Sequence, residues 1–399
     1  MLPFALTGHF DAMIQPRAQA GKALSANWPK TCVKLPATSQ FQNRCLKSGS
    51  IAAALTVSFP FSCHSDQAGL SELPPLVEMS RFVARVDFGI GSERHLMKRI
   101  LAIISLIALF SGLPAVAQDR VTLGWGRLFS NDAIGDGHDR WRTGSYQISL
   151  LRGISFNGSL PKTPGDLLEF RVSSQIIAPT HLNRTSVKDR RYVGLISLGL
   201  HTDFDWRGYE VSLGGDLFVV GPQTRVSDFQ RWVHRMMNLP NPKAMSRQIG
   251  NGVYPNVLVE LGRQTRFAPD VTLRPFVEAQ VGVENFVRVG GDLVIGTFGQ
   301  DAFMARETVT GHRYRVVRTT QSQGYSFVFG GDYTRVASSV FLPKGEAAVR
   351  SAYRKRLRAG LQWQGDDASL FYGISYLSRE FKAQSEGQIV GVLNLNLTF

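Results

Sequence analysis

A short segment in the middle of the chain combines a histidine and an amide side chain with a regular apolar pattern. His234 lies in the stretch 228–237, where apolar residues recur at α-helical spacing: Phe229, Trp232, Val233, Met236 and Met237. Gln230 precedes His234 by one turn, so both side chains project from one side of this helix. The segment predicts a general base on a short amphipathic helix, or a helix that lies on lipid headgroups without a catalytic role.

The nucleophile for such a base is suggested by what the chain lacks. All three cysteines, Cys32, Cys45 and Cys63, precede residue 97, and their spacing is not that of a metal site. The chain also has no G-x-S-x-G motif, which would place a serine nucleophile on a strand-to-helix turn. For an ester hydrolase built from these residues, activated water is therefore the most economical nucleophile.

A second group of polar residues lies about 100 positions earlier in the chain. Asn131 and Asp132 are adjacent and follow a strand-like segment, and Thr143 stands near the start of the next one. Their oxygen atoms are of the hard type that Ca²⁺ prefers. Taken alone, however, an Asn-Asp pair at the end of a strand indicates only a turn.

Two adjacent arginines, Arg190 and Arg191, form a third candidate group. A planar guanidinium can bind a phosphate or a carboxylate through two parallel hydrogen bonds. The alternative is a salt bridge with Asp189 at the rim of the fold.

Residues so far apart need a fold that gathers them, and the end of the chain indicates which fold. One face of its last segment carries Ile389, Gly391, Leu393, Leu395, Leu397 and Phe399, alternating with Asn394, Asn396 and Thr398. A period of two indicates a strand between an apolar and a polar medium. A terminal aromatic residue on such a strand is typical of outer-membrane β-barrels, in which the barrel-assembly machinery reads the last strand.

Twelve segments have strand character, an even number, as single-chain bacterial barrels usually have. They are 120–128, 143–154, 167–178, 192–203, 207–220, 254–265, 271–283, 288–300, 325–334, 353–364, 368–378 and 387–399. Aromatic residues that could form the interfacial girdles are Trp125, Tyr146, Phe170, Tyr192, Tyr209, Tyr254, Phe276, Tyr325, Tyr353, Trp363 and Tyr372. The predicted fold is all-β: a twelve-stranded antiparallel transmembrane β-barrel with a short loop helix.

The beginning of the chain agrees with export. Lys98 and Arg99 precede the apolar stretch 100–110, and Ala115 to Ala117 form a small-x-small cleavage site. Residues 97–117 are therefore predicted to be a signal peptide and residues 118–399 the outer-membrane barrel. Residues 1–96 lack sustained periodicity and are interpreted as a mis-annotated or disordered extension.

Loop lengths and charge complete the prediction. The joins 129–142, 179–191, 221–253 and 301–324 are long, as extracellular loops are, whereas 204–206, 266–270, 284–287, 365–367 and 379–386 are short, as periplasmic turns are.

Residues 119–399 are basic, and an exported basic barrel is expected to meet anionic lipid and no nucleic acid. They contain no apolar run long enough for a transmembrane helix.

Several motifs in a fixed order resemble one family. They are Ser130-Asn131-Asp132, Asp139-Arg140-Trp141-Arg142-Thr143-Gly144, Asp189-Arg190-Arg191-Tyr192-Val193-Gly194, Gln230 with His234-Arg235, and Pro240-Asn241-Pro242-Lys243. In this order they resemble the outer-membrane lipid A 3′-O-deacylases, which are twelve-stranded, calcium-dependent barrels of the bacterial outer membrane. The resemblance implies that the substrate is the 3′-linked acyl ester of lipid A in lipopolysaccharide.

The resemblance also assigns roles to the candidate residues. It implies a catalytic group of His234, Asn131, Asp132 and Thr143, with Asp132 near a bound Ca²⁺. It further implies that Arg190, Arg191 and Gln230 bind substrate. The chain departs from the pattern at Asn241, because family members often have an acidic residue in this stretch.

Two other classes of protein stay open from the residues alone. One is a different outer-membrane lipid esterase or phospholipase with a serine nucleophile, which requires a serine within hydrogen-bond reach of His234. The other is a non-catalytic barrel, in which Asn131, Asp132 and His234 would lie scattered.

Overall fold

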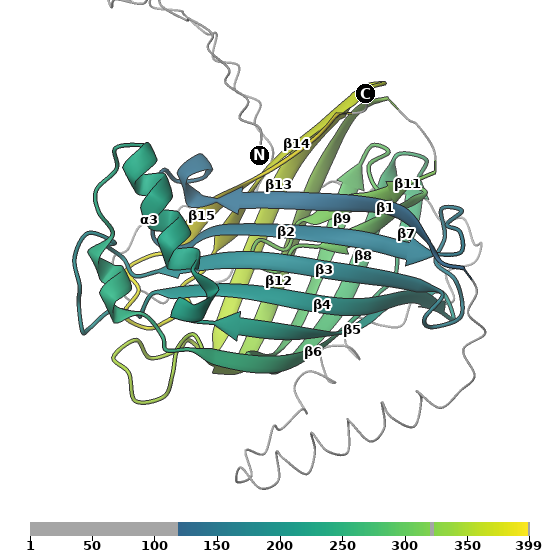
Figure 1. Cartoon of the computed structure of the whole chain (residues 1–399). Coiled ribbons are helices and arrows are strands. Elements are labelled where there is room, and N and C mark those ends of the chain that lie inside the picture. The colour runs from purple at the N-terminus through teal and green to yellow at the C-terminus, as the bar shows by residue number, and fades with distance from the viewer. Residues whose placement is uncertain (1–118, 320–322, 398–399) are drawn as a thin grey trace, which may run out of the picture. The chain divides into compact units, whose positions relative to one another are not determined.

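The computed structural model describes residues 119–319 and 323–397, and these form an antiparallel β-barrel (Figure 1). Twelve strands make its wall: β1 (Val121–Asn131), β2 (Trp141–Gly153), β3 (Leu167–Ala178), β4 (Val193–Trp206), β5 (Tyr209–Val220), β6 (Gly252–Gly262), β8 (Val271–Val281), β9 (Glu284–Ile295), β12 (Gly324–Ser339), β13 (Tyr353–Gln364), β14 (Ala368–Leu377) and β15 (Gln388–Leu397). Strand β7 (Thr265–Ala268) extends the sheet beside β8. The predicted signal peptide, the leader and Phe399 lie outside the described residues.

The wall closes on itself because each strand pairs with both neighbours. The first strand pairs with the last, with Phe129 opposite Leu393, and β6 pairs with β8 to complete the circle. The predicted twelve-stranded antiparallel barrel is confirmed, and each predicted strand segment overlaps one strand of the wall.

Alternation along the strands separates an apolar outside from a polar inside. On β14, Leu370, Tyr372, Ile374 and Tyr376 are exposed, whereas the residues between them are buried. The interior contains ion pairs, such as Arg358 with Asp292 at 2.6 Å. A barrel in lipid has this arrangement, because the hydrocarbon contacts only the outer face and the interior must pair its own charges.

Exposed aromatic residues lie near both ends of the wall. Trp125, Phe170, Trp206, Tyr325 and Trp363 are exposed toward one end, and Phe129, Tyr146, Tyr333, Tyr353 and Tyr376 toward the other. Such residues suit the two membrane–water interfaces. The predicted girdle was wrong at Tyr192 and Phe276, which are buried because their side chains point away from the lipid.

The loop prediction holds only in part. The joins 132–140, 179–192 and 221–251 lie at one end, but the short joins 282–283 and 378–387 lie at that end too. The long join after β9 lies at the opposite end, because loops alternate with strand direction and not with length. We refer to the end that holds helix α3 (Val226–Met236) as the site end.

The long join after β9 folds into the barrel as a hairpin of β10 (Ala302–Arg306) and β11 (Arg313–Arg318). The hairpin contacts the inner face of β1 where that strand has glycines. A Cβ atom at Gly126 would lie 2.4 Å from the Arg315 carbonyl oxygen, so only glycine permits this approach. Apolar residues of the hairpin, including Phe303 and Tyr314, form a core inside the wall.

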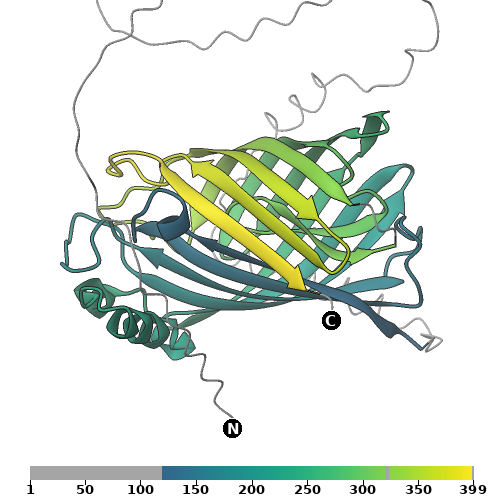
Figure 2. The same cartoon turned by 90° about the horizontal axis from the view of Figure 1, so that it is seen from above.

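Helix α3 lies against the outer side of the wall at the site end (Figures 1 and 2). Three 3₁₀ turns also occur at this end: η1 (Asp132–Ile134), η2 (Pro222–Thr224) and η3 (Lys243–Arg247). Among the described residues, no helix has the length and apolarity needed to cross a membrane.

Candidate active site

The site begins with a β-bulge in strand β2. Arg142 pairs with Ile177 and Gly144 pairs with Ile176, so Thr143 is an extra residue without a partner on β3. A bulge re-aims the side chains around it. Here it allows Arg142 to bond with Glu380 while the Thr143 hydroxyl contacts the carboxylates of the first loop at the site end.

Asp132 anchors that first loop where β1 ends. Its carboxylate accepts hydrogen bonds from the Thr143 hydroxyl at 2.7 Å, the Arg140 backbone N–H at 2.8 Å and the Gln388 amide at 3.2 Å. Asn131 precedes it and caps η1, accepting a hydrogen bond from the Ala133 backbone N–H at 2.7 Å. Gln388 opens the last strand, so Asp132 is held by residues from the beginning and the end of the barrel wall.

Asp139 connects the first loop to helix α3. Its Oδ2 lies 2.8 Å from His234 Nε2, and its Oδ1 accepts hydrogen bonds from the Thr143 hydroxyl at 2.7 Å and from Gln230 Nε2 at 3.1 Å. His234 and Gln230 lie one turn apart on the buried face of α3, as predicted. A continuous line of contacts therefore runs from Asp132 through Thr143 and Asp139 to His234.

The second ring nitrogen of His234 fixes the protonation of the imidazole. Nδ1 lies 2.8 Å from the Pro240 carbonyl oxygen, which can only accept, so Nδ1 carries a proton. Nε2 faces Asp139 Oδ2 at 2.8 Å, and this contact needs a proton on one of the two atoms. Both ring nitrogens are therefore oriented by oxygen atoms, and the ring can act as a base only when Nε2 carries no proton.

The Thr143 hydroxyl has one proton but two carboxylate neighbours, Asp132 and Asp139, both at 2.7 Å. One of these contacts therefore requires a proton on a carboxyl group or a cation nearby. Burial raises the pKa of Asp132 to about 8 and favours its protonated form. The oxygen donors of Asp132, Thr143 and Asp139 also fit a hard divalent cation. Among the described residues, no three His, Cys, Asp or Glu side chains group as metal ligands, so backbone, hydroxyl or water oxygens would have to complete such a shell.

No serine hydroxyl of residues 119–319 and 323–397 makes a hydrogen bond with His234, whose ring nitrogens contact Asp139 and Pro240. The geometry therefore does not favour a serine nucleophile activated by this histidine. Asn131, Asp132, Thr143, Gln230 and His234 come together at one end of the barrel.

The two predicted arginines lie in different surroundings. The Arg190 side chain is fully buried and pairs with Glu380, which also pairs with Arg142 at 2.8 Å. Arg191 pairs with Glu346, and its side chain is 38% exposed. Neither arginine pairs with Asp189 in the described structure. Phosphate binding by both stays a prediction, and the exposure of Arg191 makes it the more accessible of the two.

Three residues at the site were not among the predicted site residues. Asp139 and Gln388 were not identified because isolated carboxylates and amides carry no sequence signal. Tyr192 was expected in a lipid-facing girdle, but its hydroxyl is buried and has no hydrogen-bond partner among the described residues. Burial raises the pKa of Tyr192, and the nearby Asp139 adds to the effect. Tyr192 therefore keeps its proton and can donate a hydrogen bond.

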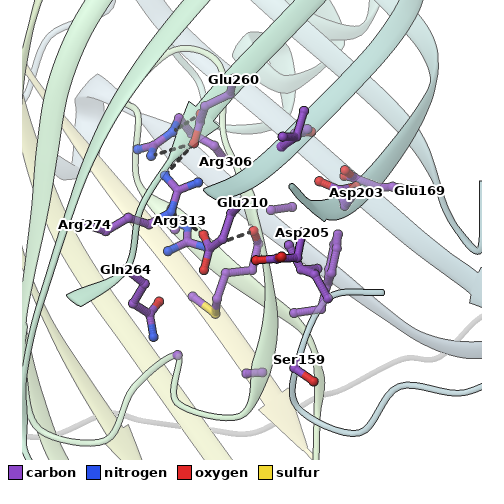
Figure 3. Close-up of a pocket in the computed structure, with 18 of the residues that line it drawn as sticks. Ser159, Glu169, Asp203, Asp205, Glu210, Glu260, Gln264, Arg274, Arg306 and Arg313 are labelled. Carbon is purple, nitrogen blue, oxygen red and sulfur yellow. Dashed lines mark hydrogen bonds and ion pairs between the residues drawn. The ribbon is translucent and has the colours of Figure 1, made fainter. Parts of the chain in front are cut away.

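A large cavity lies elsewhere, inside the barrel at the end opposite α3. Its volume is about 470 Å³, and Figure 3 shows Glu210, Glu260, Arg274 and Arg306 among its lining. These acids and bases pair with one another, for example Arg274 with Glu260 at 2.6 Å. None of the predicted site residues lines this cavity. The candidate site is therefore the polar cluster beside α3 and not this cavity.

The fold and the cluster define a transmembrane β-barrel with a polar site between its wall and a loop helix. The chain belongs to the family of the outer membrane protein LpxR, whose model matches residues 101–399, and its location is the bacterial outer membrane. LpxR from Salmonella typhimurium is similar in structure, with a TM-score of 0.59 and 17% sequence identity, covering 69% of this chain and 100% of that one. At this identity the likeness concerns the fold.

Two porins are less similar to this chain. The match to KdgM porin has a TM-score of 0.33 at 8% identity and covers 69% of this chain and 98% of that one. The match to NanC porin has a TM-score of 0.34 at 7% identity and covers 69% of this chain and 100% of that one. A comparison with curated proteins found no match.

Proposed function

We propose that this outer-membrane barrel is a lipid A deacylase that hydrolyses the 3′-linked acyl ester of lipid A with a water molecule activated by His234. The observation that carries the proposal is the line of contacts from Asp132 through Thr143 and Asp139 to His234. Family membership supports it, as does the contact of this line with helix α3, which lies on the outer side of the wall.

In the first step of the proposed reaction, His234 acts as general base. For this step Nε2 must be unprotonated and accessible to a water molecule beside Asp139; an O–H bond of that water breaks, its proton moves to Nε2, and the water oxygen bonds to the ester carbonyl carbon. Asp139 lies 2.8 Å from Nε2 and stabilises the imidazolium, while the Pro240 carbonyl keeps the ring oriented. In the second step the bond to the sugar oxygen breaks and His234 returns the proton to that oxygen.

Calcium is the metal ion that we propose for this site. Asp132 would hold it, with the Thr143 hydroxyl and Asp139 beside it. The two carboxylates share the single hydroxyl proton of Thr143, so a cation among these oxygen atoms would compensate their negative charge. When bound, Ca²⁺ supplies Lewis-acid polarisation of the ester carbonyl. The Asn131 side chain lies beside Asp132 and can donate a hydrogen bond to the substrate through its amide nitrogen.

Substrate binding is proposed for Gln230, Arg191 and Arg190. Gln230 lies within the cluster, where it also orients Asp139. A guanidinium that holds a sugar phosphate far from the ester contributes mostly uniform binding, so its loss raises KM more than it lowers kcat. Arg191 suits this role through its exposure, whereas Arg190 would have to leave Glu380.

Mass spectrometry of lipid A, with and without the protein, tests this proposal. Expression should remove the 3′-linked chains, and His234→Ala should reduce their release by about 10²–10⁴-fold. His138→Ala is the matched control, because this histidine is half-exposed at the same end of the barrel and, among the described residues, its ring hydrogen-bonds with Asp136 and not with the site. Undiminished release by a correctly folded His234→Ala barrel would refute the mechanism, and absence of release by the native protein would refute the function.

A further inference from the structure

Helix α3 has a second face, which the proposed chemistry does not use. Phe229, Trp232 and Met236 are 59%, 50% and 62% exposed, and Met237 and Leu239 extend the same apolar surface beyond the helix. The opposite face carries Gln230 and His234 and is buried. A contiguous exposed patch of large apolar side chains is uncommon on a surface that meets only water.

This apolar surface continues the lipid-facing surface of the wall. Val226, the first residue of α3, packs over Gly194 of β4, where a Cβ atom would lie 2.9 Å from the Val226 Cβ. Further along the outer face of β4, Leu198 and Leu200 are exposed. Figures 1 and 2 show α3 outside the barrel wall. The helix is thus placed next to surface that the hydrocarbon covers.

Basic residues border the apolar face. Arg225, Arg231 and Arg235 lie on or next to the helix, which contains a single carboxylate, Asp228. Asp228 pairs with Arg225 and Arg231, whereas Arg235 has no ion-pair partner among residues 119–319 and 323–397. An excess of arginine beside Trp and Phe suits a helix at the boundary between acyl chains and phosphate-bearing headgroups.

We propose that the outer face of α3 is a membrane-contact surface. Phe229, Trp232 and Met236 lie among the acyl chains of the outer leaflet, and Arg235 and Arg231 bind lipid phosphates. The helix then holds His234 at the depth where sugar and acyl chains of a membrane lipid meet. The occupant is the lipid of the membrane that the barrel itself spans, since the exposed face of α3 is continuous with the lipid-facing wall.

The proposal can be tested with single cysteines, because residues 119–399 contain none. In the full chain with Cys32, Cys45 and Cys63 replaced by serine, Phe229→Cys and Met236→Cys would each carry an environment-sensitive fluorophore. The barrel would be reconstituted in vesicles of phosphatidylglycerol and phosphatidylcholine that contain a lipid with a spin label on its acyl chain.

Two further positions calibrate the measurement. Leu198→Cys reports full contact with acyl chains, and Val187→Cys reports a loop position, since Val187 is 71% exposed in the join before β4. We expect the probes at positions 229 and 236 to be quenched nearly as strongly as the probe at 198. Quenching no stronger than at 187 would overturn the proposal. Protection from both the lipid quencher and aqueous iodide would indicate a second protein chain on this face and would also overturn it.

A second measurement connects the surface to turnover and rests on the proposed function. Trp232→Ser should raise the amount of vesicle-embedded lipid A needed for half-maximal rate, with kcat unchanged. The defect should shrink when lipid A is dispersed in detergent, since membrane docking is then not required. An equal defect in vesicles and detergent would overturn the docking role. If the protein lacks deacylase activity altogether, the quenching result still decides the membrane contact.

Discussion

Asp139→Asn is the substitution that most directly tests the line of contacts at the site. Asparagine keeps the shape of the side chain and removes its charge. In the native protein this carboxylate accepts hydrogen bonds from Thr143 and Gln230 and faces His234 Nε2 at 2.8 Å. In the variant the imidazolium that forms during the reaction has a neutral neighbour, so the transition state loses a charge-assisted hydrogen bond.

The size of the effect follows from the strength of that bond. Hydrogen bonds to charged groups contribute about 1.5–3 kcal/mol, and each 1.36 kcal/mol in the activation free energy changes the rate about tenfold. We therefore expect kcat for release of the 3′-linked chains to fall about 10- to 10²-fold. Stability should change little, because the Asp139 side chain is 35% exposed.

The assay is release of fatty acid from lipid A by the purified barrel, with folding checked by the heat-dependent shift in electrophoretic mobility. Asp136→Asn is the matched control, because Asp136 is in the same loop but contacts His138, Arg140 and the last strand. An unchanged kcat in Asp139→Asn would show that the carboxylate does not assist His234. A similar loss in both variants would attribute the effect to the loop.

Further outcomes follow from the same structure. Arg190→Ala should destabilise the barrel by about 1.5–3 kcal/mol in denaturant unfolding, because Glu380 loses one charged hydrogen-bond partner but keeps Arg142 and Arg354; a raised KM at unchanged stability would instead support phosphate binding. Because the pKa of Asp132 is raised to about 8, a proton must leave before Ca²⁺ binds. Calcium affinity measured by activity should therefore rise from pH 6 to pH 8, by at most about tenfold per pH unit, and level off above it; pH-independent affinity would contradict this assignment. Replacing residues 297–319 by a short linker should open the lumen and increase conductance in planar bilayers, since the β10–β11 hairpin fills it; unchanged conductance would show that wall side chains alone close the barrel. Tyr192→Phe should lower kcat with little loss of stability if its unpaired hydroxyl serves the reaction, whereas unchanged kinetics would make it a packing residue.

The sequence predicted the barrel well because a strand in lipid leaves a strong local pattern. Alternation of the kind seen along β15 depends only on the order of apolar and polar residues in the chain, so it could be read without knowledge of the partner strands. The amphipathic segment around His234 was readable for the same reason, and α3 begins and ends close to the predicted stretch. Loop positions were less predictable, because the length of a join does not determine which end of the barrel it occupies.

The sequence by itself determined the fold class, the helix that carries Gln230 and His234, and the oxygen-rich pair at Asn131 and Asp132. Only the tertiary structure decided which groups complete the site. Closure of the wall brings Gln388 to Asp132 across 256 positions, and the docking of α3 brings His234 to Asp139 across 95. It also buried Arg190 against Glu380 and turned Tyr192 away from the lipid. These contacts left no trace in local spacing, because a hydrogen bond or ion pair depends on distance in space, and that distance is set only when the wall closes and α3 docks against it.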